Sequence, residues 1–101
     1  MPEQGIIYLL HLDGPLHHAR HYLGWTRDLE ARLAEHTSGN GSPLVRAAIA
    51  AGATIRLAAT IEGTRDDERA IKRCKDAPSR CPICQPTETE RRPFHVPRRA
   101  A

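Results

Sequence analysis

The sequence has few aromatic side chains, few cysteines and no long apolar run, and each shortage excludes a class of protein. Only 4% of the 101 residues are aromatic, so the hydrophobic core must rest on Leu, Ile, Val and Ala. No apolar run is long enough to span a bilayer, and the short polar start, Met1–Gln4, lacks the pattern of a signal peptide. Three cysteines clustered in one stretch do not form the framework of a secreted disulfide-rich protein. We therefore expect a cytoplasmic protein.

The length and the charge of the chain bound its organisation. A chain of 101 residues can bury one modest core, which leaves room for a single domain. Its net charge is +3, and basic residues are concentrated after Arg65. A basic C-terminal third is compatible with contact to the phosphate backbone of nucleic acid, but a solvated helix face followed by a charged tail explains the same charges.

Three short segments have the patterns of β-strands. Gly5–Leu12 reads G-I-I-Y-L-L-H-L, is rich in β-forming residues and is followed by the turn signal D-G-P, which predicts a buried strand. His21–Trp25 is close enough to pair with it as an antiparallel hairpin. From Thr54 onward the chain alternates, as a half-buried strand does. This alternation would place the following residues on one side: Ile55, Leu57, Ala59 and Ile61.

Helix-start signals occur at three further places. The predicted helices are Arg27–His36, Pro43–Ala51 and Arg65–Cys74, with Thr26, Ser42 and Thr64 as their N-caps. The last helix carries Asp67 at its third position, a variant of the capping box. From 76 to 101 five prolines and few apolar residues predict irregular structure. The expected fold is therefore α/β in the broad sense, of the α+β type, with a three-stranded antiparallel sheet flanked by about three helices.

A constellation of five polar residues runs through these predicted elements: Tyr8, Tyr22, Arg32, His36 and Glu68. The first tyrosine closes an I-I-Y triplet in the first strand, and the second opens a Y-L-G triplet in the second strand. The arginine and the histidine are one turn apart on the next helix, and the glutamate is on the last predicted helix. Together, over Gly5 to Arg73, they resemble the GIY-YIG nuclease family. The triplets depart from the signature, since Ile6 stands where the family has glycine and leucine replaces the second isoleucine.

The resemblance implies an endonuclease that hydrolyses nucleic-acid phosphodiester bonds, DNA more than RNA, with Mg²⁺ or Mn²⁺ as cofactor. In it Tyr22 activates or positions the attacking water and Tyr8 belongs to the same hydroxyl cluster. Arg32 offers a planar charged fork that matches phosphate oxygens, and His36 orients the network or contacts the phosphate. Glu68 supplies the carboxylate for the metal ion. A protein partner could supply target specificity, because a minimal domain has little surface for reading sequence.

Other interpretations of the same residues remain open. Arg32 with Glu35, and Glu68 with Lys72, could be surface ion pairs at helical spacing. The chain could also be a non-catalytic nucleic-acid-binding module that keeps this fold and uses its basic tail, in which the arginines are Arg91, Arg92, Arg98 and Arg99. Some members of the resembled family carry a lysine directly after the second triplet, where this sequence has Trp25, so the resemblance does not support a lysine-assisted form of the mechanism.

Cysteine and histidine residues suggest a second metal. Cys81 and Cys84 form a C-x-x-C pair, and a candidate structural zinc set is Cys74, Cys81, Cys84 and His95. Free thiols and a redox-active pair are the alternatives. The remaining histidines near the first turn could form a transition-metal cluster, but no acidic or thiolate residue lies at a fixed spacing from them, so they are interpreted as part of a solvated or nucleic-acid-facing loop: His11, His17, His18 and His21. The sequence thus predicts a nuclease-like domain at 1–75 and an irregular basic tail at 76–101 that zinc could stabilise.

Overall fold

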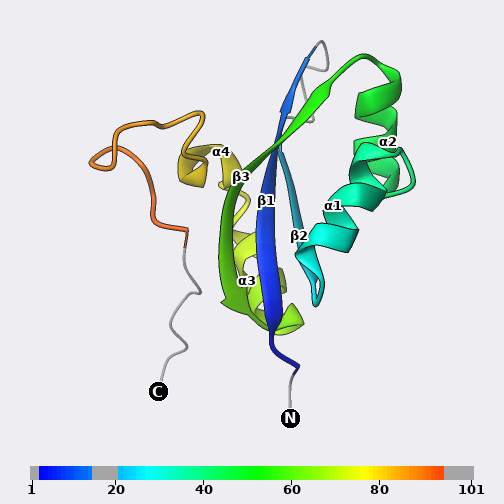
Figure 1. Cartoon of the computed structure of the whole chain (residues 1–101). Helices are drawn as coiled ribbons and strands as arrows, with labels where there is room; N and C mark the ends of the chain where they lie inside the picture. Colours follow the sequence, from blue (N-terminus) through cyan, green and yellow to red (C-terminus); the bar gives the residue numbers. More distant parts are fainter. Residues whose placement is uncertain (1–2, 15–20, 95–101) are drawn as a thin grey trace.

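The computed structural model of the chain describes residues 3–14 and 21–94. Within these ranges one antiparallel sheet holds three strands in the order β2-β1-β3 (Figure 1). The strands are β1 (Gly5–Asp13), β2 (His21–Thr26) and β3 (Thr54–Gly63). The predicted α+β fold with a three-stranded antiparallel sheet is confirmed.

Helices cover both faces of the sheet. They are α1 (Leu29–Thr37), α2 (Pro43–Ala50), α3 (Arg65–Cys74) and the short α4 (Ala77–Arg80). Figure 1 shows α1 and α2 on one side of the strands, and α3 and α4 on the other. The side covered by the first pair is named the α1/α2 face, and the side covered by the second pair is named the α3/α4 face.

The central strand β1 is buried on both sides, which explains its nearly continuous apolar sequence. Ile7 and Leu9 point to the α3/α4 face, where they form a core with Ile71. Tyr8 and Leu10 point to the opposite face and form a second core with residues of α2. The sheet therefore separates two small cores, and adjacent residues of β1 serve different sides of the molecule.

A β-bulge changes the face of β3. Leu57 and Ala59 oppose consecutive residues of β1, which leaves Ala58 as the extra residue. Because one extra residue reverses the side-chain alternation, Ile55 packs into the core of the α1/α2 face while Ile61 packs into the other core. The expectation that the apolar residues of this strand all share one side was wrong, because simple alternation cannot anticipate a bulge.

The helix caps agree with the sequence at two of three places. In α3 the Thr64 side chain accepts from Asp67 N, and the Asp67 side chain accepts from Thr64 N, so the predicted capping box is formed. The predicted cap of α2, Ser42, is also in place. For α1 the cap is Asp28, whose carboxylate accepts from the third helical N–H, and the predicted Thr26 instead bonds to the backbone of that aspartate.

The described part of the tail, 76–94, is more ordered than its composition predicts. It begins with α4, and Cys81 has no exposed surface and belongs to the core with Ile7 and Leu9. Arg80 is 3% exposed and its guanidinium is bonded to Asp76. These contacts attach the segment to the α3/α4 face. Among the described residues, none of the helices combines the length and the apolar character needed to cross a membrane.

Candidate active site and candidate metal centre

The tyrosine of the first triplet lies at the centre of a buried hydrogen-bond network. Tyr8 has no exposed surface, its hydroxyl accepts from Nε of Arg32 at 3.3 Å, and it lies 2.9 Å from Nε2 of His36. Since the hydroxyl carries one proton and two lone pairs, it can donate to the imidazole while it accepts from the guanidinium. The spacing of one helical turn between Arg32 and His36 brings both side chains to one phenol.

Two glycines make room for this network. Gly24 is the cross-strand partner of Tyr8, and a Cβ on it would lie closer than 3.0 Å to the phenol Cζ and Oη. A Cβ on Gly41 would approach Nδ1 of His36 equally closely. The glycine of the Y-L-G triplet is therefore required by the close approach of the tyrosine ring. The role of Gly41, in the loop between α1 and α2, had no signal in the sequence beyond loop composition.

Burial sets the protonation of the network. It raises the pKa of Tyr8, which the hydrogen bond from Arg32 only partly offsets. Burial, followed by the charge of Arg32, lowers the pKa of His36. Both groups are therefore neutral near pH 7. His36 has no exposed surface, so it cannot contact a phosphate in this conformation, and of its two predicted roles the geometry leaves that of orienting the network.

An open groove of about 530 Å³ lies beside this network, lined by residues from β2, α1 and α3. Tyr22, Arg32 and Glu68 are among its lining residues, whereas Tyr8 and His36 are not. Tyr22 is half-buried, and its ring lies 6.2 Å from that of Tyr8, centroid to centroid. The structure thus divides the five predicted residues: three face the groove and two lie behind them.

The charged members of the groove also form the ion pairs that the alternative interpretation expects. Arg32 is 3.4 Å from Glu35, and Glu68 is 3.5 Å from Lys72. Arg32 does more than pair at the surface, because its Nε is bonded to Tyr8. The Glu68 side chain is only 13% exposed, although it is an acidic residue on a largely polar helix.

Trp25 explains how α3 reaches the groove. Its indole N–H donates to the Gly63 carbonyl at 2.9 Å, and the guanidinium of Arg65 lies 4.6 Å from the centre of its rings. These contacts hold the start of α3 beside β2, and Glu68 is one turn further along that helix. The sequence showed only that Trp25 stands where some members of the resembled family carry a lysine.

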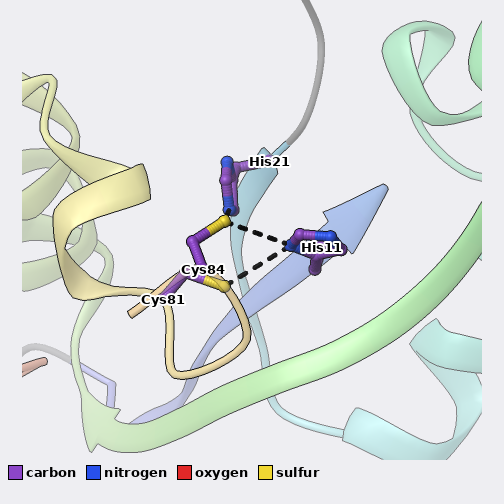
Figure 2. Close-up of side chains that lie close together, drawn as sticks. All are labelled: His11, His21, Cys81 and Cys84. Carbon is purple, nitrogen blue, oxygen red and sulfur yellow. Dashed lines mark hydrogen bonds between the residues drawn. The ribbon is translucent and has the colours of Figure 1, made fainter. Parts of the chain in front are cut away.

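A second constellation lies on the α3/α4 face. His11 and His21 are cross-strand partners in β1 and β2, and Cys81 and Cys84 come from the loop that follows α4 (Figure 2). The four side-chain ligand atoms all lie within 4.8 Å of one another, so the group could hold a metal ion. The Cys81 and Cys84 Sγ atoms lie 3.5 and 3.6 Å from Nδ1 of His11, and the latter sulfur is 3.4 Å from Nε2 of His21.

This grouping corrects part of the predicted zinc set. Cys74 is exposed on α3, where its Sγ lies 3.5 Å from the carbonyl oxygen of Ala70, and it does not belong to the cluster. His95, with His17 and His18, lies outside the described residues. His11 and His21 are in paired strands and face the cysteines, so the interpretation of these two as loop residues was wrong. Linear spacing cannot reveal a pair that only strand register brings together.

A carboxylate orients the first histidine of the cluster. Nε2 of His11 lies 2.8 Å from Oδ1 of Asp13, which is also paired with Arg56. The hydrogen bond from Arg56, more than that from His11, lowers the pKa of Asp13, so this group is an ionised acceptor near neutral pH. The imidazole therefore donates its Nε2 proton to the carboxylate and turns the lone pair of Nδ1 toward the sulfur atoms.

Comparisons of the chain with known protein families, with curated proteins and with solved structures find no match.

Proposed function

We propose that the protein is a metal-dependent endonuclease that hydrolyses phosphodiester bonds of nucleic acid, with DNA as the preferred substrate. The observation that carries the proposal is the groove, in which a phenol, a guanidinium and a carboxylate from three separate elements face one space: Tyr22, Arg32 and Glu68. These are the groups that the resemblance to GIY-YIG nucleases assigns to water activation, phosphate binding and metal binding.

The charge of the groove suits a polyanionic substrate. Five basic residues line it against two acidic ones: Arg27, Arg32, Arg65, Arg69 and Lys72 against Asp28 and Glu68. Asp28 is already engaged, because its carboxylate caps α1. Three of the basic residues, Arg27, Arg32 and Arg69, pair with Glu3, Glu35 and Asp66, which a phosphate backbone would have to displace. A concave surface with excess positive charge attracts the phosphate backbone and raises the local concentration of substrate.

The side chains divide the work of hydrolysis according to their exposure. Arg32 binds the non-bridging oxygens of the scissile phosphate, and its hydrogen bond to the buried Tyr8 fixes the orientation of its planar fork. Tyr22, which faces the groove, positions the attacking water by hydrogen bonding. To act as the base, the phenol first releases its own proton to solvent, helped by the nearby positive charge, and the phenolate then accepts the proton of the water. Tyr8 and His36 keep the guanidinium and the second phenol in place, and do not touch the substrate.

The donor set of the groove fits a hard divalent cation. Glu68 offers a carboxylate whose side chain is 13% exposed, and Mg²⁺ is commonly held by one or two carboxylates with the remaining positions left to water and substrate oxygens. Bound there, the ion would supply positive charge against the negative charge that develops on the phosphate. Lys72, which now pairs with Glu68, would turn toward the substrate backbone.

The ion pair between Glu68 and Lys72 is the observation that favours the second candidate, a non-catalytic nucleic-acid-binding module. In that case binding would not depend on Mg²⁺. The tail gives this candidate less support than its charge implied, because Arg91 bonds to the carbonyl of Gln85 and Arg92 pairs with Asp76. Intramolecular partners leave these two arginines less available for phosphate.

The experiment that separates the candidates is a cleavage and binding screen with the purified chain. Duplex, branched, flapped and single-stranded DNA, and matched RNA, are incubated with Mg²⁺, with Mn²⁺ and with chelator, and binding is measured in parallel at several salt concentrations. We expect metal-dependent cleavage of at least one DNA substrate. Salt-sensitive binding with no cleavage of any substrate in either metal would reject the nuclease and leave the binding module.

The groove offers few side chains that could read a nucleic-acid sequence. The groove has no described aromatic residue besides Tyr22 and Trp25, and the latter is covered by Arg65, so sequence reading by base stacking has little support. We therefore expect target choice to come from nucleic-acid shape or from a protein partner. None of the three cysteines is in a disulfide, which suits the reducing conditions of a cytoplasm.

A further inference from the structure

We propose that His11, His21, Cys81 and Cys84 bind one Zn²⁺ ion, which fastens the segment after α4 to the strands β1 and β2. The centre is structural, lies on the α3/α4 face, and does not rest on the proposed nuclease function. Figure 2 shows the side chains, with the two cysteines of the loop facing the two histidines of the sheet.

The distances fit a tetrahedral ion. Zinc bonds of about 2.3 Å to sulfur and about 2.0–2.1 Å to nitrogen, at tetrahedral angles, separate a sulfur ligand from a nitrogen ligand by about 3.6 Å. The sulfur–nitrogen separations in the cluster are 3.5, 3.6 and 3.4 Å. Three of the six edges of the required tetrahedron are therefore already close to their ideal length, and the other three are no longer than 4.8 Å.

Hydrogen bonding among the four residues explains this arrangement less well. The Nδ1 atom of His11 faces the sulfur atoms of both Cys81 and Cys84, yet a neutral imidazole nitrogen has one lone pair. Thiols are also weak donors. An ion at the centre satisfies the sulfur and nitrogen atoms together, and the hydrogen bond from Nε2 of His11 to Asp13 is the kind of outer contact that orients a zinc-bound histidine.

The ligand set selects zinc among the common divalent ions. Thiolate and imidazole are ligands for zinc, whereas Mg²⁺ prefers oxygen. On binding, each thiol gives up its proton to solvent, and two thiolates with two neutral imidazoles balance the charge of the ion. Four protein ligands close the coordination sphere and leave no position for water or substrate, so the centre has no catalytic function.

Burial shows what the centre would stabilise. Cys81 has no exposed surface and packs with Ile7, Leu9 and Leu23, and it is 70 residues away from His11 in sequence. Because positions so distant in sequence come together only on folding, the ion would bind the folded protein and not the unfolded chain, and would hold the segment after α4 against the sheet.

The test is metal analysis of the purified full-length chain, reduced, stripped with chelator and then titrated with Zn²⁺ or Co²⁺. We expect about one tightly bound zinc ion per chain, and with Co²⁺ the visible bands of a tetrahedral site together with thiolate-to-metal charge-transfer absorption. C81S and H21A should lose the tight site, while C74S, the third cysteine outside the cluster, should keep it.

The wild-type titration keeps the proposal falsifiable even where C81S fails to fold, because it needs no variant. Absence of stoichiometric zinc in the reduced wild-type chain would overturn the proposal, as would a Cys81–Cys84 disulfide that forms in place of metal uptake under reducing conditions. Equal loss of the site in C74S would overturn the assignment of ligands. Since the readout is metal content, none of these results depends on cleavage activity.

Discussion

Two polar regions of the molecule differ in how open they are. The groove runs along the edge strand β2, between α1 on one face of the sheet and α3 on the other, and leaves Tyr22, Arg32 and Glu68 in contact with solvent. The cation ligand proposed for it, Glu68, offers an oxygen atom. The cluster of His11, His21, Cys81 and Cys84 lies on the α3/α4 face and packs nitrogen and sulfur atoms against one another at the edge of a core. An open site with one hard ligand suits an exchangeable ion and a substrate, whereas a closed set of soft ligands suits a permanent ion.

Strand β2 joins the two regions. His21 faces the cluster and its neighbour Tyr22 packs toward the other face, against the rings of Tyr8 and His36. Because successive residues of a strand point to opposite faces, an ion that fixes the end of β2 would also help to fix the phenol of the groove. We therefore expect the groove and the cluster to have different functions, and expect both to depend on the position of β2.

The largest expected effect is on the cleavage rate, and it distinguishes Tyr22 from Tyr8. Tyr22→Phe should lower the cleavage rate by about 10²–10⁴-fold, because it removes the group that positions and deprotonates the water, while binding stays largely intact. Tyr8→Phe should mainly destabilise the fold, by about 1–3 kcal/mol, since it removes the hydroxyl bonded to the buried imidazole of His36 and to Nε of the partly exposed Arg32. Single-turnover cleavage and denaturant unfolding of both variants make the test. If both substitutions lowered the cleavage rate equally, Tyr22 would not differ from Tyr8 in its role, and the assignment of Tyr22 alone to the reacting water would be wrong.

The next effect concerns the metal centre. With free zinc at 100 to 1,000 times its dissociation constant, the ion should add about 3–4 kcal/mol to the free energy of unfolding. A zinc-selective chelator, used with Mg²⁺ in excess, should remove this stability from the wild type and from Cys74→Ser, but not from Cys81→Ser, which already lacks it. Denaturant unfolding at fixed free zinc measures the difference. Zinc-independent stability of the wild type would contradict a structural ion.

A third effect tests the close approach at the second triplet. Gly24→Ala should destabilise the protein by about 1–3 kcal/mol, because its Cβ would overlap the ring and hydroxyl of Tyr8. In a Tyr8→Ala background the same substitution should cost much less, since the ring is gone. The double-mutant cycle is measured by denaturant unfolding. Additive costs would show that the glycine is not there to admit the tyrosine.

The smallest effect is a pH dependence from His36. Burial and the charge of Arg32 lower its pKa in the folded protein, whereas the unfolded chain has the ordinary value of about 6.5. As the pH falls below about 6.5, the unfolded chain takes up a proton that the folded protein does not, so the free energy of unfolding decreases. His36→Gln should flatten this decrease relative to the wild type in unfolding measurements from pH 7.5 to about 5. An unchanged slope would show that folding does not lower the pKa of His36.

Much of the fold follows from local patterns in the sequence. Apolar runs, turn signals and caps predicted the three strands and α3 with its capping box of Thr64 and Asp67. What failed depends on contacts across the chain: the bulge at Ala58 follows from pairing with β1. The cap of α1 was assigned to Thr26 because two capping residues lie close together, and only the backbone conformation selects Asp28.

The residues of the two candidate sites could be predicted only in part, again because contacts between distant parts of the chain are not visible in the sequence. The motif residues of the groove could be named from the sequence, although the separation of Tyr8 and His36 from Tyr22 required burial to be known. The C-x-x-C pair and the histidines could each be recognised, but not their association, because His11 and His21 become cross-strand neighbours through strand register and meet the cysteines only in the folded chain. Cys74 was predicted as a zinc ligand because it lies close to the C-x-x-C pair in sequence, but its side chain is exposed on α3.

The most direct test of the central claim is the rate of Mg²⁺-dependent cleavage by Glu68→Gln, measured beside Asp66→Asn in zinc-loaded protein. Both carboxylates are on α3, but only Glu68 lines the groove, and Asp66 is paired with Arg69 at the surface. The proposed function predicts that Glu68→Gln lowers cleavage to background with its zinc content and nucleic-acid binding retained, while Asp66→Asn cleaves at close to the wild-type rate. Wild-type cleavage by Glu68→Gln would contradict a catalytic site in this groove.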